Sequence, residues 1–72
     1  MYKVVLAFNI GVLMEEKCDY LEAINCYRES ISLNPFAIDS YARLASMQSR
    51  LGQNEEALNT LEEGRRQLDL LM

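Results

Sequence analysis

Residues 7–35 read AFNIGVLMEEKCDYLEAINCYRESISLNP, and their pattern recurs 34 positions later in YARLASMQSRLGQNEEALNTLEEG at residues 41–64. At this spacing, large apolar residues pair with large apolar residues and small residues pair with small ones. The matching pairs are Ile10 with Leu44, Gly11 with Ala45, Cys18 with Gly52, Ala23 with Ala57, Ile24 with Leu58, Tyr27 with Leu61 and Ser30 with Gly64. So many matches in one register indicate an internal repeat, the signature of stacked supersecondary units.

The period inside each unit is that of an α-helix. Leu6, Ile10, Leu13 and Met14 recur at helical spacing, which predicts that they form the buried face of a first helix. Ala23, Ile24 and Tyr27 belong to a second helix, and Tyr41, Leu44, Ala45 and Met47 to a third. A fourth helix contains Ala57, Leu58, Leu61 and Leu68.

Capping residues predict where these helices begin and end. Asp19 is a candidate N-cap for the second helix, and Pro35 ends it because the residue before proline disfavours the helical region. The third helix should run from residue 37 or 38 to residue 51, with Gly52 in the left-handed position that follows it. Asn54 is expected to cap the fourth helix. We therefore expect one all-α domain, residues 1–72, with a first repeat over about 4–37 and a second over about 38–71.

Composition excludes several classes of partner. The net charge is −4 and the basic residues are scattered, whereas a nucleic-acid-binding protein normally carries a basic stripe. The acidic balance argues against a membrane surface in the same way, and the longest apolar stretch is too short to span a bilayer. We see no signal-peptide pattern, so we expect the two cysteines to be reduced in the cytoplasm or another reducing compartment.

The sequence offers no chemistry typical of an enzyme. It has no histidine that could activate Cys18 or Cys26 as a nucleophile. The adjacent glutamate pairs lie next to each other in sequence, and such neighbours do not face each other on a helix. We therefore expect no catalytic residue, no metal site and no cofactor.

The chain resembles the tetratricopeptide repeat family from about residue 4 to residue 68. The family pattern of small, aromatic and turn residues is met in the first unit by Ala7, Ile10, Gly11, Met14, Cys18, Ala23, Tyr27, Ser30 and Pro35. The second unit meets it with Tyr41, Leu44, Ala45, Gln48, Gly52, Ala57, Leu61 and Gly64. The resemblance implies a short right-handed α-solenoid, in which Gly11 and Ala23 allow close helix crossing and Tyr27 and Leu61 fill the space between neighbouring helices. Three of these residues depart from the family pattern: Ala7 stands at a bulky aromatic position, Cys18 at the turn glycine and Gln48 at an aromatic position.

The resemblance also implies a protein-binding function, because the first helix of each unit lines a concave groove in this family. By offset, that face consists of Val5, Phe8, Asn9 and Val12 in the first unit and of Asp39, Ala42, Arg43, Ser46 and Arg50 in the second. A ligand with an apolar anchor beside an acidic group would suit this face. Phe8 is expected either to anchor such a ligand or to be buried against another repeat. Some family members clamp the acidic tails of chaperones, but Asp39 stands where that clamp needs a lysine.

Two repeats fall short of the roughly three that stacked units need for stability. The chain should therefore be a fragment of a longer array, associate with itself, or be covered by another protein. Leu68 and Leu71 near the C-terminus are candidate contacts at an uncovered end. Our leading hypothesis is a protein–protein interaction scaffold, and the alternative is a structural unit that forms homo-oligomers through its apolar ends.

Overall fold

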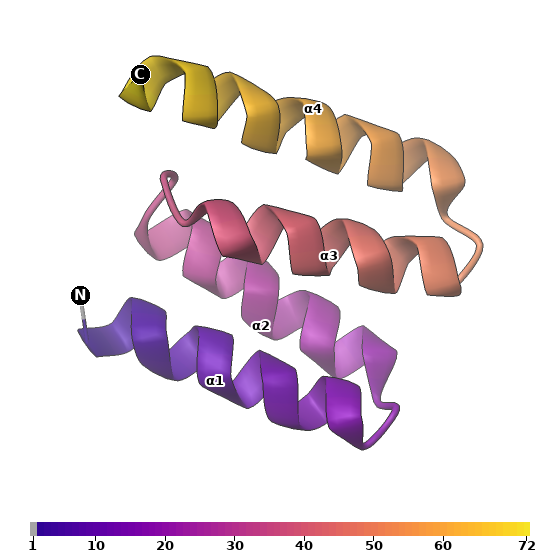
Figure 1. Ribbon diagram of the computed structural model, residues 1–72. Helices are drawn as coiled ribbons and strands as arrows, with labels where there is room; N and C mark the ends of the chain where they lie inside the picture. The colour runs from indigo at the N-terminus through magenta and orange to yellow at the C-terminus, as the bar shows by residue number, and fades with distance from the viewer. Residues whose placement is uncertain (1) are drawn as a thin grey trace.

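The computed structural model describes residues 2–72, which form four helices and no strand. The helices are α1 (Tyr2–Glu16), α2 (Tyr20–Leu33), α3 (Ile38–Arg50) and α4 (Asn54–Leu71). Each packs against the next, so that they form two antiparallel hairpins stacked on each other, with α2 in contact with both α1 and α3 (Figure 1). The expected all-α class and α-solenoid arrangement are confirmed.

The first two interhelical turns follow the predicted signals. The backbone N–H of Glu22 donates to Asp19 Oδ1 at 3.4 Å, so Asp19 is the N-cap of α2. Asn34 ends α2 in an extended conformation before Pro35, and its side chain accepts the N–H of Phe36 at 3.0 Å. This side-chain bond stabilises the turn from which α3 starts.

The turn before α4 differs by one residue from the prediction. Gly52 adopts the expected left-handed conformation, with φ of 79°. Asn54, however, lies inside the first turn of α4, and Gln53 occupies the N-cap position without a side-chain capping bond. The prediction that Asn54 caps α4 was wrong because the carbonyl of Gln53 already accepts the N–H of Ala57 at 2.9 Å. The helical hydrogen bonds therefore begin one residue earlier than the polar side chain suggested.

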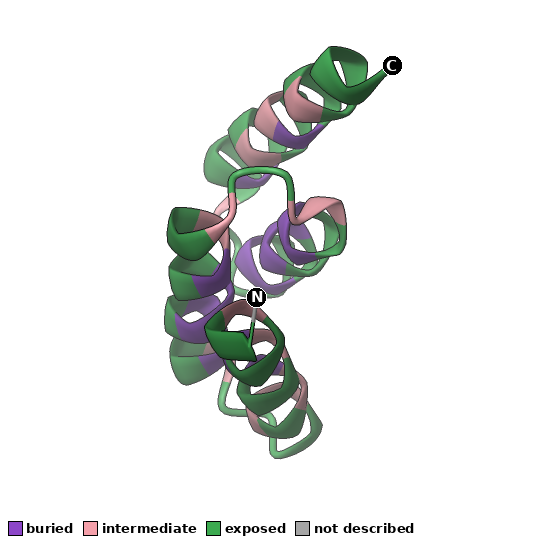
Figure 2. Ribbon diagram, turned by 90° about the vertical axis from the view of Figure 1, so that its left-hand side faces the viewer, coloured by how far each residue is buried: buried purple, intermediate pink, exposed green. Residues whose placement is uncertain are grey.

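The core lies where α1, α2 and α3 meet. Its buried cluster consists of Ala23, Ile24, Tyr27, Leu44 and Met47, and Phe8, Val12, Met14, Tyr20 and Ile31 pack around it. Figure 2 shows buried residues gathered between these helices, whereas α4 is mainly exposed. The second hairpin therefore contributes chiefly through α3.

The predicted buried face of α1 was largely wrong. Leu6, Ile10 and Leu13 are exposed, and the helix instead buries Ala7 and Gly11. The reason is the close approach of α2: a Cβ on Gly11 would lie 2.6 Å from Cε1 of Tyr27. Small residues decide which side of α1 meets α2, with Phe8, Val12 and Met14 packed beside them. Leu6, Ile10 and Leu13 are left on another side.

The two residues expected to fill the space between helices have different surroundings. Tyr27 is completely buried, as expected, because α3 covers it. Leu61, its equivalent in the second repeat, is half exposed, so its expected burial was wrong. Among residues 2–72, no helix lies over α4 as α3 lies over α2.

Candidate protein-binding surfaces

A first open hollow of about 450 Å³ lies between the N-terminal halves of α1 and α3. Its walls are mostly apolar and include Val4, Val5 and Phe8 of α1 and Phe36 and Ile38 beside or on α3. The carboxylate of Asp39 stands among them. We call this hollow the α1–α3 groove. It can accept an apolar side chain and presents one negative charge next to it.

A pair of buried serines forms part of this groove's floor. The hydroxyl oxygens of Ser30 and Ser40 lie 2.7 Å apart and share a hydrogen bond between α2 and α3. Both residues are almost fully buried, so the bond satisfies two polar groups that burial would otherwise penalise. Sequence reasoning missed this pair, since a serine in a helix carries no pattern that names its partner.

A polar cluster links α1, α2 and α3 and borders the groove at Phe8. Glu15 Oε1 accepts the hydroxyl of Tyr27 at 2.8 Å and lies 3.3 Å from Nη1 of Arg43. The Arg43 guanidinium also lies 5.4 Å from the centre of the Phe8 ring, which tilts against Tyr27. Burial and the bond to Glu15 raise the pKa of Tyr27 to about 12. The charge of Arg43 is therefore already partnered within the chain.

The second repeat has a polar contact where the first has none. Thr60 donates its hydroxyl proton to Oε1 of the buried Gln48 at 2.7 Å, joining α4 to α3. The equivalent residues in the first repeat are Met14 and Cys26. Sequence reasoning noted that Gln48 departs from the family pattern but did not find Thr60, which only the structure places opposite it.

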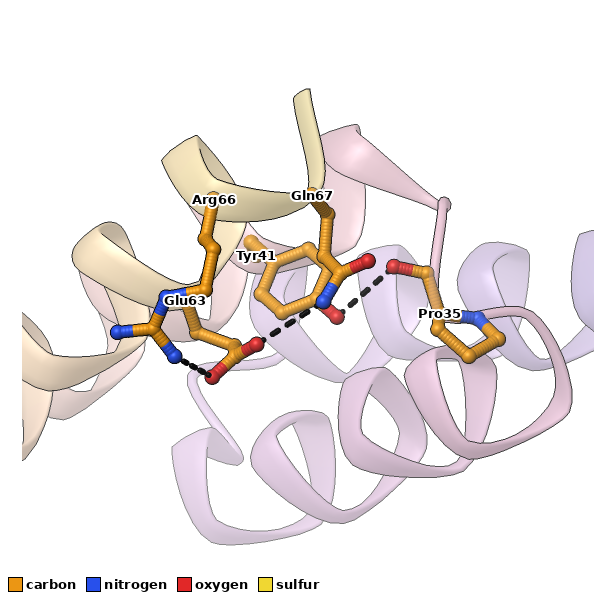
Figure 3. A network of polar contacts seen from close by, with 5 residues as sticks. All are labelled: Pro35, Tyr41, Glu63, Arg66 and Gln67. Carbon is orange, nitrogen blue, oxygen red and sulfur yellow. Dashed lines mark hydrogen bonds and ion pairs between the residues drawn. The ribbon is translucent and has the colours of Figure 1, made fainter. Parts of the chain in front are cut away.

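Further polar contacts hold the N-terminal end of α3 and link neighbouring turns of α4 (Figure 3). The Tyr41 hydroxyl donates to the carbonyl of Pro35 at 2.9 Å, which ties α3 to the turn before it. On α4, Glu63 accepts from Gln67 at 3.0 Å and pairs with Arg66 at 3.1 Å. These charges are satisfied within the helix, so they do not mark a ligand site.

A second open hollow, of about 500 Å³, lies between α3 and α4, and we call it the α3–α4 groove. Its walls are alanines and serines of α3 and, on α4, one asparagine, one alanine and two leucines. They are Ala42, Ala45, Ser46, Ser49, Asn54, Ala57, Leu58 and Leu61. Leu68 lies in a smaller hollow that continues along α4 past Gly64.

The nine residues predicted for one concave face are distributed over several places. Val5, Phe8 and Asp39 line the α1–α3 groove, and Ala42 and Ser46 line the α3–α4 groove. Phe8 and Val12 pack partly against the core, whereas Asn9 is exposed. Arg43 sits in the polar cluster, and Arg50 lies 5.6 Å from the ring centre of Tyr20. Leu68 and Leu71 are exposed on α4.

Both cysteines are free thiols, at an exposed turn for Cys18 and in a buried site for Cys26. Burial raises the pKa of the Cys26 thiol, which keeps it protonated and unreactive. Within residues 2–72, no group of histidine, cysteine, aspartate and glutamate side chains is arranged to hold a metal ion. None of the helices there is long and apolar enough to cross a bilayer.

Two family models match the chain, and both describe a tetratricopeptide repeat. One matches residues 6–36, which is most of α1 and all of α2. The other matches residues 26–59, from the second half of α2 through α3 into α4. No individual curated protein matches.

Proposed function

Since the chain belongs to the tetratricopeptide repeat family, we propose that it is a protein–protein interaction module whose α1–α3 groove receives a partner's peptide or helix. Family membership supports the general function of a binding scaffold. The observation that carries the proposed site is the apolar α1–α3 groove itself, an open hollow with a single carboxylate among its walls. Recognition sites of this kind combine apolar lining with a few placed polar groups.

The charges around the groove favour a basic partner. Asp39 is exposed, and no cation within residues 2–72 forms an ion pair with it. Arg43, which the sequence suggested as a partner for an acidic group, is instead paired with Glu15. We therefore propose a segment with a large apolar side chain next to a lysine or arginine. Such a partner places its cation beside Asp39 and its apolar side chain among Val5, Phe8 and Phe36.

A pair of synthetic peptides tests this proposal. One carries a leucine flanked by arginines, and the other has glutamate in place of each arginine. In titrations of labelled protein followed by NMR, the arginine peptide should shift the amide signals of Val5, Phe36 and Asp39, and the glutamate peptide should bind about tenfold more weakly. Asp39→Asn should remove the difference between the peptides, and Val5→Asp should weaken binding of the arginine peptide.

Leu21→Asp is the matched control, because Leu21 is an exposed leucine of α2 that lines neither groove. Shifts that map outside the α1–α3 groove, or equal affinities for both peptides, would contradict the site.

We also propose that the chain works in a reducing compartment such as the cytoplasm. The support is that Cys18 and Cys26 are both free thiols in the folded chain, one exposed and one buried.

A further inference from the structure

The α3–α4 groove is the second-repeat equivalent of a site that is filled in the first repeat. Subtracting the repeat length of 34 from the groove's lining residues gives positions that surround α3 in the first repeat. Among them, Phe8, Val12 and Tyr20 pack on the core cluster that contains Leu44 and Met47, and Ala23, Ile24 and Tyr27 belong to it. In the first repeat this space is occupied by α3. In the second repeat the same positions line an open hollow.

One face of α3 packs against α2, and the equivalent face of α1 is exposed. Leu44 is 5% exposed and Met47 is 0% exposed, but their equivalents Ile10 and Leu13 are 38% and 52% exposed. Ser40 is 1% exposed, and its equivalent Leu6 is 46% exposed. The chain thus carries an uncovered groove at one end and, at the other end, an uncovered helix face in the register that fits it.

We propose that a second copy of this chain seats its α1 in the α3–α4 groove, so that copies associate head to tail. Leu6, Ile10 and Leu13 of the second copy then pack against α4 in the places equivalent to those that Ser40, Leu44 and Met47 occupy against α2. The interface between copies continues the contact between α2 and α3 by one further repeat. Because its two surfaces are different parts of the chain, association does not stop at a symmetric dimer.

The polar contacts of the filled site are replaced in a matched way. The hydrogen bond between Ser30 and Ser40 becomes a pairing of Gly64 with Leu6, in which neither residue brings a polar side chain. Replacing both partners of a buried bond by apolar groups carries little penalty, whereas replacing one leaves an unsatisfied group.

The charged pair is exchanged in the same manner. Glu15 and Arg43 lie 3.3 Å apart in the filled site, and their equivalents in the proposed interface are Ser49 and Asn9. Both charges are replaced by neutral groups that can bond to each other. The proposed interface therefore buries no unpaired charge at this position. Burying such a charge would strongly oppose association.

Two complementary variants test the head-to-tail arrangement. Ile10→Asp damages the α1 face and keeps the groove, whereas Leu61→Asp damages the groove and keeps the α1 face. In sedimentation velocity from about 1 µM to about 1 mM, the unchanged protein should grow in mass with concentration. Each variant alone should associate at least about tenfold more weakly, because a buried unpaired carboxylate opposes the contact. An equimolar mixture should form a heterodimer that does not grow further.

Other outcomes would overturn the proposal. A protein that stays monomeric over this range has no such interface. If only one variant dissociates and the other still self-associates, the contact joins two identical faces. A mixture that stays monomeric excludes the pairing of α1 with the groove.

Three controls separate these results from unfolding and from the proposed peptide site. Circular dichroism checks that each variant stays helical. If Ile10→Asp or Leu61→Asp unfolds, Ile10→Gln or Leu61→Gln is used in its place. Leu21→Asp should associate normally, since Leu21 lies on neither surface. Val5→Asp should also associate normally, because Val5 lines the α1–α3 groove, so the two proposals can fail independently.

Discussion

The two helical hairpins have the same fold but differ in what covers their second helix. Tyr27 of α2 is 0% exposed, whereas its equivalent Leu61 of α4 is 50% exposed. Both are large residues at the same place in a repeat, and the difference between them is the presence of α3 over α2. Burial in this protein therefore depends on a residue's place in the stack as much as on its type.

The hairpins also differ in how their own two helices meet. In the first, Gly11 allows the Tyr27 ring to approach α1, and in the second Gly64 allows α4 to approach Tyr41. Each close approach combines one glycine with one tyrosine, but the glycine is on the first helix in one hairpin and on the second helix in the other. Both hairpins pair one glycine with one tyrosine, and they differ in which helix supplies each residue.

The largest expected effect separates the covered position from the open one. Tyr27→Ala should lower the free energy of unfolding by about 3–5 kcal/mol, because it empties a fully buried aromatic site. That loss is comparable to the whole stability of a domain this small, so the helical signal should largely disappear. Leu61→Ala should cost less than about 1 kcal/mol at its exposed position. Urea unfolding followed by circular dichroism measures both losses. Equal losses of unfolding free energy in the two variants would contradict the difference between the covered and the open position.

The close approaches give the second prediction. A Cβ on Gly64 would lie 2.7 Å from Cβ of Tyr41, an atom fixed to the backbone of α3. Gly64→Ala should therefore push α3 and α4 apart and cost about 1–3 kcal/mol. Gly11→Ala should cost a similar amount, because its added atom meets the fully buried ring of Tyr27, which packs on Phe8 and donates to Glu15. Unfolding midpoints of both variants, measured under the same conditions, test this prediction, and a variant as stable as the unchanged protein would contradict it.

The third prediction concerns the polar contact of the second hairpin. Thr60→Val removes the hydroxyl that donates to the side chain of buried Gln48. It should lower the free energy of unfolding by about 1–3 kcal/mol, because Oε1 of Gln48 is left without a hydrogen bond. Gln48→Met combined with Thr60→Cys copies the first repeat and should recover most of that loss. A double variant less stable than Thr60→Val alone would show that the hairpins cannot exchange these pairs.

The smallest effect is expected at the turns within the hairpins. Cys18 has a φ of 60°, which is strained for a residue with a side chain, whereas Gly52 has a φ of 79° at the equivalent turn. Cys18→Gly should stabilise the protein by about 1 kcal/mol and Gly52→Ala should destabilise it by a similar amount. A stability loss in Cys18→Gly, measured by thermal unfolding, would mean that the thiol has contacts that outweigh the strain.

The sequence was sufficient to predict the number, order and approximate limits of the helices, because periodicity and turn residues are local signals. It failed at Leu6, Ile10 and Leu13, because apolar residues occupy more than one side of α1 and only the neighbouring helix decides which side is buried. Gly11 indicates which side of α1 is buried, since a small residue marks the side where another helix approaches closely.

The candidate site was harder to predict. Val5, Phe8 and Asp39 were identified and share a groove, but the pairing of Arg43 with Glu15 joins residues 28 positions apart on different helices. Ser30 with Ser40 and Gln48 with Thr60 are pairs of the same kind. Each depends on the distance between two helices, which no single stretch of sequence specifies.

The order of the helices in space also bears on how quickly the protein forms. The main contacts join α1 to α2, α2 to α3 and α3 to α4, so that most touching residues are close along the chain. Short loops close with little loss of entropy, and proteins dominated by such contacts fold in microseconds to milliseconds. With α2 held from both sides, its amide hydrogens should be the last to exchange with solvent, and those at the end of α4 the first. The stack therefore opens from α4 toward its centre.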